Sequence, residues 1–247
     1  MAVHGHHRMG HRHRSGESDR TAIITFGIAL SPLFIILVAG LVAHADLLRI
    51  ISYLGLSLTR LITAYGIALF IAVSLSLLLS LFKTGDRAIP FLDALQNIPS
   101  FALIPLFALA FGYSSIMIIL FAVTSIVWPI LFNVLSAMKT AREDLSEAAT
   151  IFHCTGWNRA LHFLLPVGVP AMVTGSLVGI SIGWEAIIGA EIIGSAEGIG
   201  SLLNTAGNTG DSPVLFSGIA ILLALVVLIN KFIWLPLIKE SRLYSGE

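Results

Sequence analysis

Two carboxylates lie inside a long apolar stretch of this chain. Glu185 and Glu191 are the only Asp, Glu, Lys or Arg residues between Arg159 and Glu197. An ionisable side chain inside a membrane-length apolar segment is costly, and by default it marks a solute pathway or a paired structural site. Six residues of α-helix set the two side chains roughly 120° apart, so they do not form one paired-carboxylate site. For Glu185, a pathway role and a structural role both stay open.

The remaining residues give little support for a metal site or a phosphate-binding site. His153, Cys154 and His162 lie close in sequence, and thiolate and imidazole are zinc ligands. Three loosely spaced ligands on amphipathic helices more often pack or face solvent, so we predict no metal site. The chain has no G-x-x-x-x-G-K-[ST] motif, which cradles phosphate in ATPases. We therefore predict that the chain is not an enzyme, binds no cofactor and does not hydrolyse ATP itself.

The N-terminal tail has an unusual composition. Residues 1–20 hold five of the eight His residues and four of the fourteen Lys and Arg residues. No apolar periodicity runs through them, which predicts a disordered tail. Imidazole binds zinc, copper or nickel, so metal binding stays open beside the simpler interpretation of a solvated, cationic tail.

The overall composition predicts an all-α membrane protein. Of 247 residues, 56% are hydrophobic and 11% are charged, and the mean hydropathy is +0.93, whereas soluble domains carry roughly 25% charged residues. Apolar stretches long enough to cross a bilayer predict six transmembrane helices, at 21–43, 61–82, 88–112, 114–137, 167–193 and 214–235. The first is too long for the apolar core of a signal peptide. One domain, 21–238, lies between the tails 1–20 and 239–247, and 44–60 is expected to be a short amphipathic connection.

The third predicted span differs from the others in composition. Residues 88–112 contain three prolines and three polar side chains, Asp93, Gln96 and Asn97. Irregular backbone at membrane depth is tolerated only where protein or a water-filled cavity surrounds it. We therefore predict a broken or kinked span whose polar first half, with Gln96 and Asn97, lies near the cytoplasm or a pathway.

The distribution of basic residues orients the six spans. An even number of spans places both termini on one side, together with twelve of the fourteen Lys and Arg residues. Only Arg49 and Arg60 fall on the opposite side. Because basic residues concentrate on the cytoplasmic side of a membrane, both termini and the segment around Glu147 are predicted to be cytoplasmic.

A mixed-polarity segment, 143–166, separates the fourth and fifth predicted spans. Two sets of apolar residues follow helical spacing but are out of phase with each other: Leu145, Ala148, Ala149 and Phe152, then Trp157, Ala160, Leu161 and Leu164. This pattern predicts two short amphipathic helices within 140–165 and a break near Cys154–Gly156. Thr140 and Glu143 form a Thr-x-x-Glu capping box, which predicts a helix start.

This pattern resembles a known signature. Glu147-Ala148-Ala149, followed by a helix break and Leu165-Pro166, is similar to the EAA loop of permease subunits of ATP-binding-cassette (ABC) importers. Residues 99–106, 111–112, 184–191 and 198–200 resemble the branch that imports nitrate, sulfonates, taurine, bicarbonate and related small anions. The chain departs from that family at His153, where a glycine is expected, and Gly156 follows three positions later.

The resemblance implies partners and site residues. It implies two cytoplasmic ABC ATPase subunits that bind ATP, a second copy or a related permease, an extracytoplasmic solute-binding protein, and no nucleic acid. The implied location is the cytoplasmic membrane of a bacterium or archaeon. The residues expected to couple to the ATPase are Glu147, Ala148, Ala149, Phe152, His153, Gly156 and Trp157. Separately from what the resemblance implies, the residues that we expect along the translocation path are Gln96, Asn97, Asn133, Trp184, Glu185 and Glu191.

Several alternatives stay open. Glu191 matches an acidic position of the family, and a carboxylate beside an anion pathway would repel the solute, which favours a hydrogen-bonded, structural Glu191. Another hypothesis is an ATP-independent channel or ion-coupled carrier that uses Glu185 and Glu191, and a third is a scaffold whose His-rich tail sequesters metal. The solute (nitrate, bicarbonate, a sulfonate, taurine or a heterocyclic vitamin precursor) and the choice between homodimer and heterodimer stay open.

Small residues recur every fourth position in the fifth predicted span, at Ala171, Gly175, Gly179 and Gly183. A small-residue face allows two helices to approach closely. We predict that this face packs within the chain, with a dimer seam as the alternative.

Overall fold

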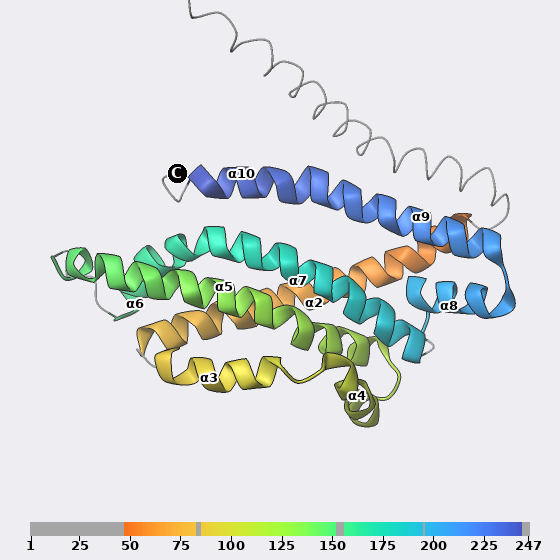
Figure 1. Ribbon diagram of the computed structural model, residues 1–247, viewed down its shortest axis with the longest axis horizontal. Coiled ribbons are helices and arrows are strands. Elements are labelled where there is room, and N and C mark those ends of the chain that lie inside the picture. The colour runs from red at the N-terminus through yellow and green to blue at the C-terminus, as the bar shows by residue number, and fades with distance from the viewer. Residues whose placement is uncertain (1–46, 83–84, 152–155, 195, 244–247) are drawn as a thin grey trace, which may run out of the picture.

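A computed structural model describes residues 47–82, 85–151, 156–194 and 196–243, and within these ranges only the backbone of 85–87, 141–151, 242 and 243. The described residues form helices and no strands (Figure 1). Four helical stretches are long and apolar enough to cross a membrane: Leu47–Leu81, Ser115–Thr140, Gly156–Gly194 and Ser212–Ser241. Ala88–Gln96 and Ser100–Phe111 form a bent pair that would make a fifth. The predicted first span, 21–43, lies outside the described residues, so the total of six stays a prediction.

Helix α2 (Leu47–Leu81) begins earlier than the sequence suggested. The prediction of a separate connecting segment at 44–60 is wrong for residues 47–60, because α2 runs through them without a break. Its 35 residues are about 52 Å long, well beyond a hydrocarbon core of about 30 Å. The helix tolerates Ser57 and Arg60 because both side chains are buried against protein.

The predicted third span is broken, as its prolines suggested. Helix α3 (Gly85–Gln96) is followed by a 3₁₀ turn (Ser100–Leu103) and by α4 (Ile104–Phe111), with a bend of 79° between the two halves. Phe101 and Phe107 attach the second half to α5, because their rings lie 6.0 and 6.1 Å from the Phe121 ring. Such aromatic pairs add stability beyond the apolar area they bury.

Helices α5 (Ser115–Ile151) and α7 (Leu165–Gly194) form the centre of the molecule, with α2 packed against both (Figure 1). A Cβ added at Gly175 would lie 2.9 Å from the Ile130 Cα and from the Pro129 carbonyl oxygen of α5. A Cβ added at Gly183 would lie 2.7 Å from the Ile126 side chain. The small-residue face of α7 therefore packs within the chain, which confirms the prediction.

Helix α5 continues far beyond its apolar part. The start predicted from the Thr140 capping box is wrong, because Thr140 lies inside a continuous helix of 37 residues. The membrane-length apolar stretch of the helix ends before Lys139, and the eleven residues after Thr140 extend the helix by about 17 Å. Glu147, Ala148 and Ala149 lie on this extension.

The chain resumes at Gly156, whose φ of +57° suits glycine. The four-residue helix α6 (Gly156–Arg159) passes through a π-helical segment (Ala160–Leu164) directly into α7. Gly156 is the last residue of the predicted break, and residues 152–155 lie outside the described part. The two predicted short helices are instead, where described, continuations of the helices on either side.

The last described helices complete the bundle. Helix α8 (Ile199–Thr209) lies across the end opposite α6, and Asp211 caps α9 (Ser212–Ile229) by accepting from the Val214 amide. A second π-helical segment (Asn230–Trp234) joins α9 to α10 (Leu235–Leu243). This stretch corresponds to the predicted sixth span.

Candidate functional site

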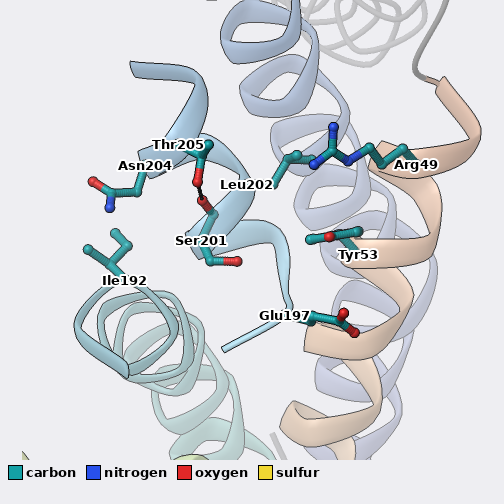
Figure 2. Close-up of a pocket in the computed structure, with 8 residues that line it drawn as sticks. All are labelled: Arg49, Tyr53, Ile192, Glu197, Ser201, Leu202, Asn204 and Thr205. Carbon is teal, nitrogen blue, oxygen red and sulfur yellow. Dashed lines mark hydrogen bonds between the residues drawn. The ribbon is translucent and has the colours of Figure 1, made fainter. Parts of the chain in front are cut away.

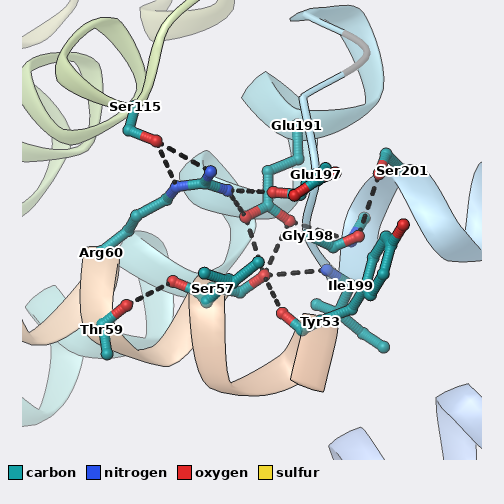
Figure 3. A network of polar contacts seen from close by, with 12 residues as sticks. Tyr53, Ser57, Thr59, Arg60, Ser115, Glu191, Glu197, Gly198, Ile199 and Ser201 are labelled. Carbon is teal, nitrogen blue, oxygen red and sulfur yellow. Dashed lines mark hydrogen bonds and ion pairs between the residues drawn. The ribbon is translucent and has the colours of Figure 1, made fainter. Parts of the chain in front are cut away.

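A buried ion pair joins α2 to α7 at the end of the molecule where α8 lies (Figure 3). The Arg60 Nη1 lies 2.7 Å from the Glu191 Oε1, and the Glu191 side chain is fully buried. The Ser57 hydroxyl donates to the same carboxylate, whose two oxygens lie 2.7 and 2.9 Å away. The Gly200 amide donates to the Glu191 Oε2 at 3.0 Å. Charge-assisted hydrogen bonds of this kind are stronger than neutral ones.

The same side chains also hold the turn between α7 and α8 and the first residue of α5. The Ile199 amide donates to the Ser57 hydroxyl at 2.9 Å, and Arg60 donates to the Glu197 carbonyl. The Arg60 Nη2 donates to the Ser115 hydroxyl at 2.9 Å. We call Ser57, Arg60, Ser115, Glu191 and Gly200 the ion-pair cluster. It connects α2, α5, α7 and α8.

Two glycines allow the turn to come this close. A Cβ at Gly198 would lie 2.2 Å from the Glu191 carboxylate carbon, and a Cβ at Gly200 would lie 2.5 Å from the Ile188 carbonyl oxygen. Any side chain at either position would push the turn away from Glu191. The cluster therefore requires the Gly198-Ile199-Gly200 sequence.

The surroundings of Glu191 suit a structural carboxylate. A buried charge is tolerated when it is paired and hydrogen-bonded, and Glu191 has both kinds of partner. The hydrogen bonds expected of a structural Glu191 are present, whereas its place on the translocation path stays a prediction. Sequence reasoning missed Arg60, which it assigned to a loop. The signal was available, because a lone arginine and a lone glutamate in apolar helices each need a partner.

The other predicted path residues are dispersed. Glu185 is exposed on α7 while Glu191 is buried, so the two do not form one site. Trp184 is buried in the core, and Gln96 and Asn97 are exposed at the end of α3, where both contact Asp93. Of this set, Asn133 lines a cavity.

The cavity beside Asn133 lies between α3 and α5 and has a volume of about 510 Å³. Asn133, Ser136 and Lys139 follow one another at spacings of three residues on α5, and Ile89 of α3 lies opposite them. The Asn133 amide donates to the Pro129 carbonyl at 2.7 Å, which leaves its own carbonyl oxygen as an acceptor. An apolar wall with a few polar groups is typical of a small-solute cavity.

Little is described at the predicted coupling segment. Glu147, Ala148 and Ala149 are helical, but their side chains, and all of Phe152 and His153, are outside the described part. Trp157 is 58% exposed, which leaves a large apolar ring beside the break in the helix. The Nη2 of Arg159 is buried and has no hydrogen-bond partner among the described residues.

The described residues contain no group of three potential metal ligands. His153 and Cys154 lie outside them, and the His162 Nδ1 is 3.3 Å from the Asn158 carbonyl oxygen. The prediction of no metal site in this segment is therefore untested.

One G-x-S-x-G sequence, Gly179–Gly183, escaped the sequence reasoning. In hydrolases this pattern places serine on a sharp turn between a strand and a helix. Ser181 instead lies in the middle of α7, and its hydroxyl donates to the Leu177 carbonyl at 3.0 Å. The pattern does not form a nucleophile site here.

Long apolar helices, a broken span and a buried intramembrane ion pair define a multi-pass membrane protein. Residues 64–235 match the model of the family described as the binding-protein-dependent transport system inner membrane component. The chain belongs to this family, and it is similar to the family's permeases for taurine, sulfonates, nitrate and bicarbonate. Members of the family are transport permeases and not enzymes.

Individual relatives are distant. The taurine transport system permease protein of Escherichia coli is 24% identical over 72% of this chain and 66% of its own length. A putative aliphatic sulfonates transport permease protein of Bacillus subtilis is 26% identical over 64% of this chain and 58% of its own length. The nitrate import permease protein of Leptolyngbya laminosa is 30% identical over 60% of this chain and 51% of its own length. The chain thus spans between half and two thirds of the length of these relatives.

Proposed function

We propose that this chain forms the translocation path of an ATP-driven importer for a small solute, and that separate ATPase subunits drive it. The family match carries this proposal. A second copy or a related permease would complete the path, and a solute-binding protein would deliver the solute from outside. ATP would bind only to the ATPase subunits.

The shape of α5 supports a mechanical coupling. Its extension beyond Thr140 is continuous with the membrane-length part of the helix, and the other side of the break leads directly into α7. A force applied at Glu147–Trp157 would therefore act on the two central helices through continuous helical backbone. Closure of the ATPases would tilt these helices and switch the path between inward-open and outward-open states.

The cavity beside Asn133 supports a position for the inner part of the path. It lies near the end of α5 that carries the extension, and Asn133 and Ser136 line it with amide and hydroxyl groups. Those groups suit an anionic or polar solute. Substrates of the relatives, such as taurine and nitrate, have this chemistry.

Reconstitution tests the function. We expect vesicles containing this chain, its ATPase and its binding protein to take up labelled taurine or nitrate only when ATP is supplied to the ATPase. The chain alone should neither hydrolyse ATP nor take up solute. The competing carrier hypothesis predicts uptake by the chain alone, driven by a pH gradient and indifferent to ATP. That result would overturn the proposal.

The single cysteine allows the proposed orientation to be measured. Cys154 lies in the segment proposed to face the cytosol, so a membrane-impermeant maleimide is expected to label it in inverted vesicles but not in right-side-out vesicles. As a matched control, Asn208→Cys on the exposed face of α8, in a Cys154→Ser background, should show the opposite pattern. Labelling of Cys154 from outside would place the coupling segment on the wrong side for an ATPase.

A further inference from the structure

A pocket opens at the α8 end of the molecule, between α2 and α8 (Figure 2). Its volume is about 170 Å³, which is ample for a solute of several heavy atoms, because one water needs about 10–15 Å³ of such space. Helix α2 supplies Arg49 and Tyr53, the turn before α8 supplies Glu197, and α8 supplies Ser201, Asn204 and Thr205. The Arg60 hydrogen bond to the Glu197 carbonyl fixes one edge of the pocket.

The charged groups of this pocket have no ionic partner within the described chain. Arg60 is paired with Glu191, whereas the Arg49 guanidinium lies over the Tyr53 ring, 5.6 Å from its centroid. No ion pair joins Arg49 to Glu197 in the described residues. Figure 2 shows these two side chains on either side of Tyr53. Among the described residues, the pocket thus presents a cation and a carboxylate that are not paired with each other.

The hydroxyl groups of Ser201 and Thr205 add hydrogen-bond acceptors to the pocket. The Ser201 hydroxyl donates to the Gly198 carbonyl, and the Thr205 hydroxyl donates to the Ser201 carbonyl. Their hydrogens are used, so their oxygens remain as acceptors toward the pocket. Donors to an anionic group therefore come from Arg49, with the Asn204 amide at the same rim. Acceptors for an ammonium group come from Glu197 and the two hydroxyl oxygens.

We propose that this pocket binds a small zwitterion, with its oxyanion group on Arg49 and its ammonium group near Glu197. A simple anion would meet the Glu197 carboxylate as well as Arg49, and a simple cation would meet Arg49. A guanidinium group binds a planar or tetrahedral oxyanion through two parallel hydrogen bonds. Amino acids and aminosulfonates have both required charges. As a receiving site for an imported solute, the pocket rests on the proposed function.

Paired ligands that differ by one charge test the proposal. The chain would be placed in nanodiscs of phosphatidylcholine without ATPase, and binding of taurine and of ethanesulfonate, which lacks the ammonium group, would be measured. Arg49→Gln is expected to weaken both ligands at least tenfold. Glu197→Gln is expected to weaken taurine at least tenfold but to leave ethanesulfonate unchanged or bound more tightly. Equal loss of both ligands in Glu197→Gln, or no taurine binding by the wild type, would overturn the proposal.

Three controls sharpen this experiment. Glu240→Gln removes an exposed carboxylate at the opposite end, so it should change neither ligand. Arg49→Lys retains the cation and should bind taurine more tightly than Arg49→Gln, which separates loss of charge from misfolding. Phosphatidylethanolamine also combines an oxyanion with an ammonium group. If that lipid occupies the pocket and taurine does not displace it, the site binds lipid and the proposal is wrong. Because no ATPase is present, a negative result leaves the proposed ATP-driven transport untouched.

Discussion

Glu191→Ala is expected to destabilise the protein by about 3–5 kcal/mol, because it leaves the Arg60 guanidinium buried without its counter-charge. The Ser57 hydroxyl, the Gly200 amide and Arg60 would lose a shared acceptor at the same time. The turn that carries α8 would then be held less firmly. Thermal unfolding of the purified protein in detergent would show the loss as a lower midpoint and a lower yield of monodisperse protein.

Two further variants show whether Glu191→Ala destabilises the protein through the unpaired Arg60 charge or through the lost packing of the Glu191 side chain. Replacing both partners, as Arg60→Met with Glu191→Leu, should recover most of the stability, because breaking a buried pair costs more than removing it. Glu240→Ala removes an exposed carboxylate and should change stability by no more than about 0.5 kcal/mol. If Glu191→Ala unfolds like the wild type, the ion-pair cluster does not hold this end of the molecule.

Glu147→Lys is expected to reduce co-purification of the ATPase at least tenfold while the chain still inserts into the membrane. The reversed charge would lie on the extension of α5, in the proposed contact with the ATPase, and a close like-charge or unpaired contact in an interface is costly. Affinity purification of the tagged chain from its own host, followed by an assay for ATP hydrolysis in the eluate, measures the effect.

A matched variant tests whether position or charge matters. Glu240→Lys makes the same reversal on α10, which ends on the same side of the molecule, and it should retain the ATPase. Ala149→Asp adds a charge on the extension itself and should behave like Glu147→Lys. Wild-type recovery of ATPase with both Glu147→Lys and Ala149→Asp would contradict the coupling assignment.

Local composition predicted the membrane class, the broken third span and the helix break near Gly156, because each depends on neighbouring residues. Prediction from local composition failed where contacts between residues far apart in the sequence determine the structure. Residues 44–60 were predicted to be a short amphipathic connection, yet α2 begins at Leu47, and it accommodates Arg60 because Glu191, 131 residues away, neutralises that side chain. The Thr140 capping box suggested a helix start, but the residues around it are strong helix formers and an existing helix propagates easily.

Some features of the candidate site could likewise be predicted from the sequence, whereas others depend on the fold. Sequence reasoning identified Glu191 and the glycines at 198 and 200 but could not show that they touch, since only the fold brings Ser57 and Arg60 to them. It listed Asn133 without a reason, and the structure gives Asn133 a cavity. The pocket beside Arg49 was not foreseen, because its residues come from three separate segments. The coupling residues Glu147, Ala148 and Ala149 are still supported by family likeness and backbone alone.

The continuity of α5 has a mechanical consequence. Its first residue, Ser115, accepts two hydrogen bonds from Arg60, and Glu147 lies thirty-two positions later in the same helix. A single helix about 55 Å long therefore joins the proposed ATPase contact to the ion-pair cluster. A movement of the ATPase-facing end of α5 would be transmitted along the helix backbone to its other end. No chain of side-chain contacts between the two ends would be needed. Only Pro129, which interrupts the backbone bonding of this helix, offers a point where it could flex.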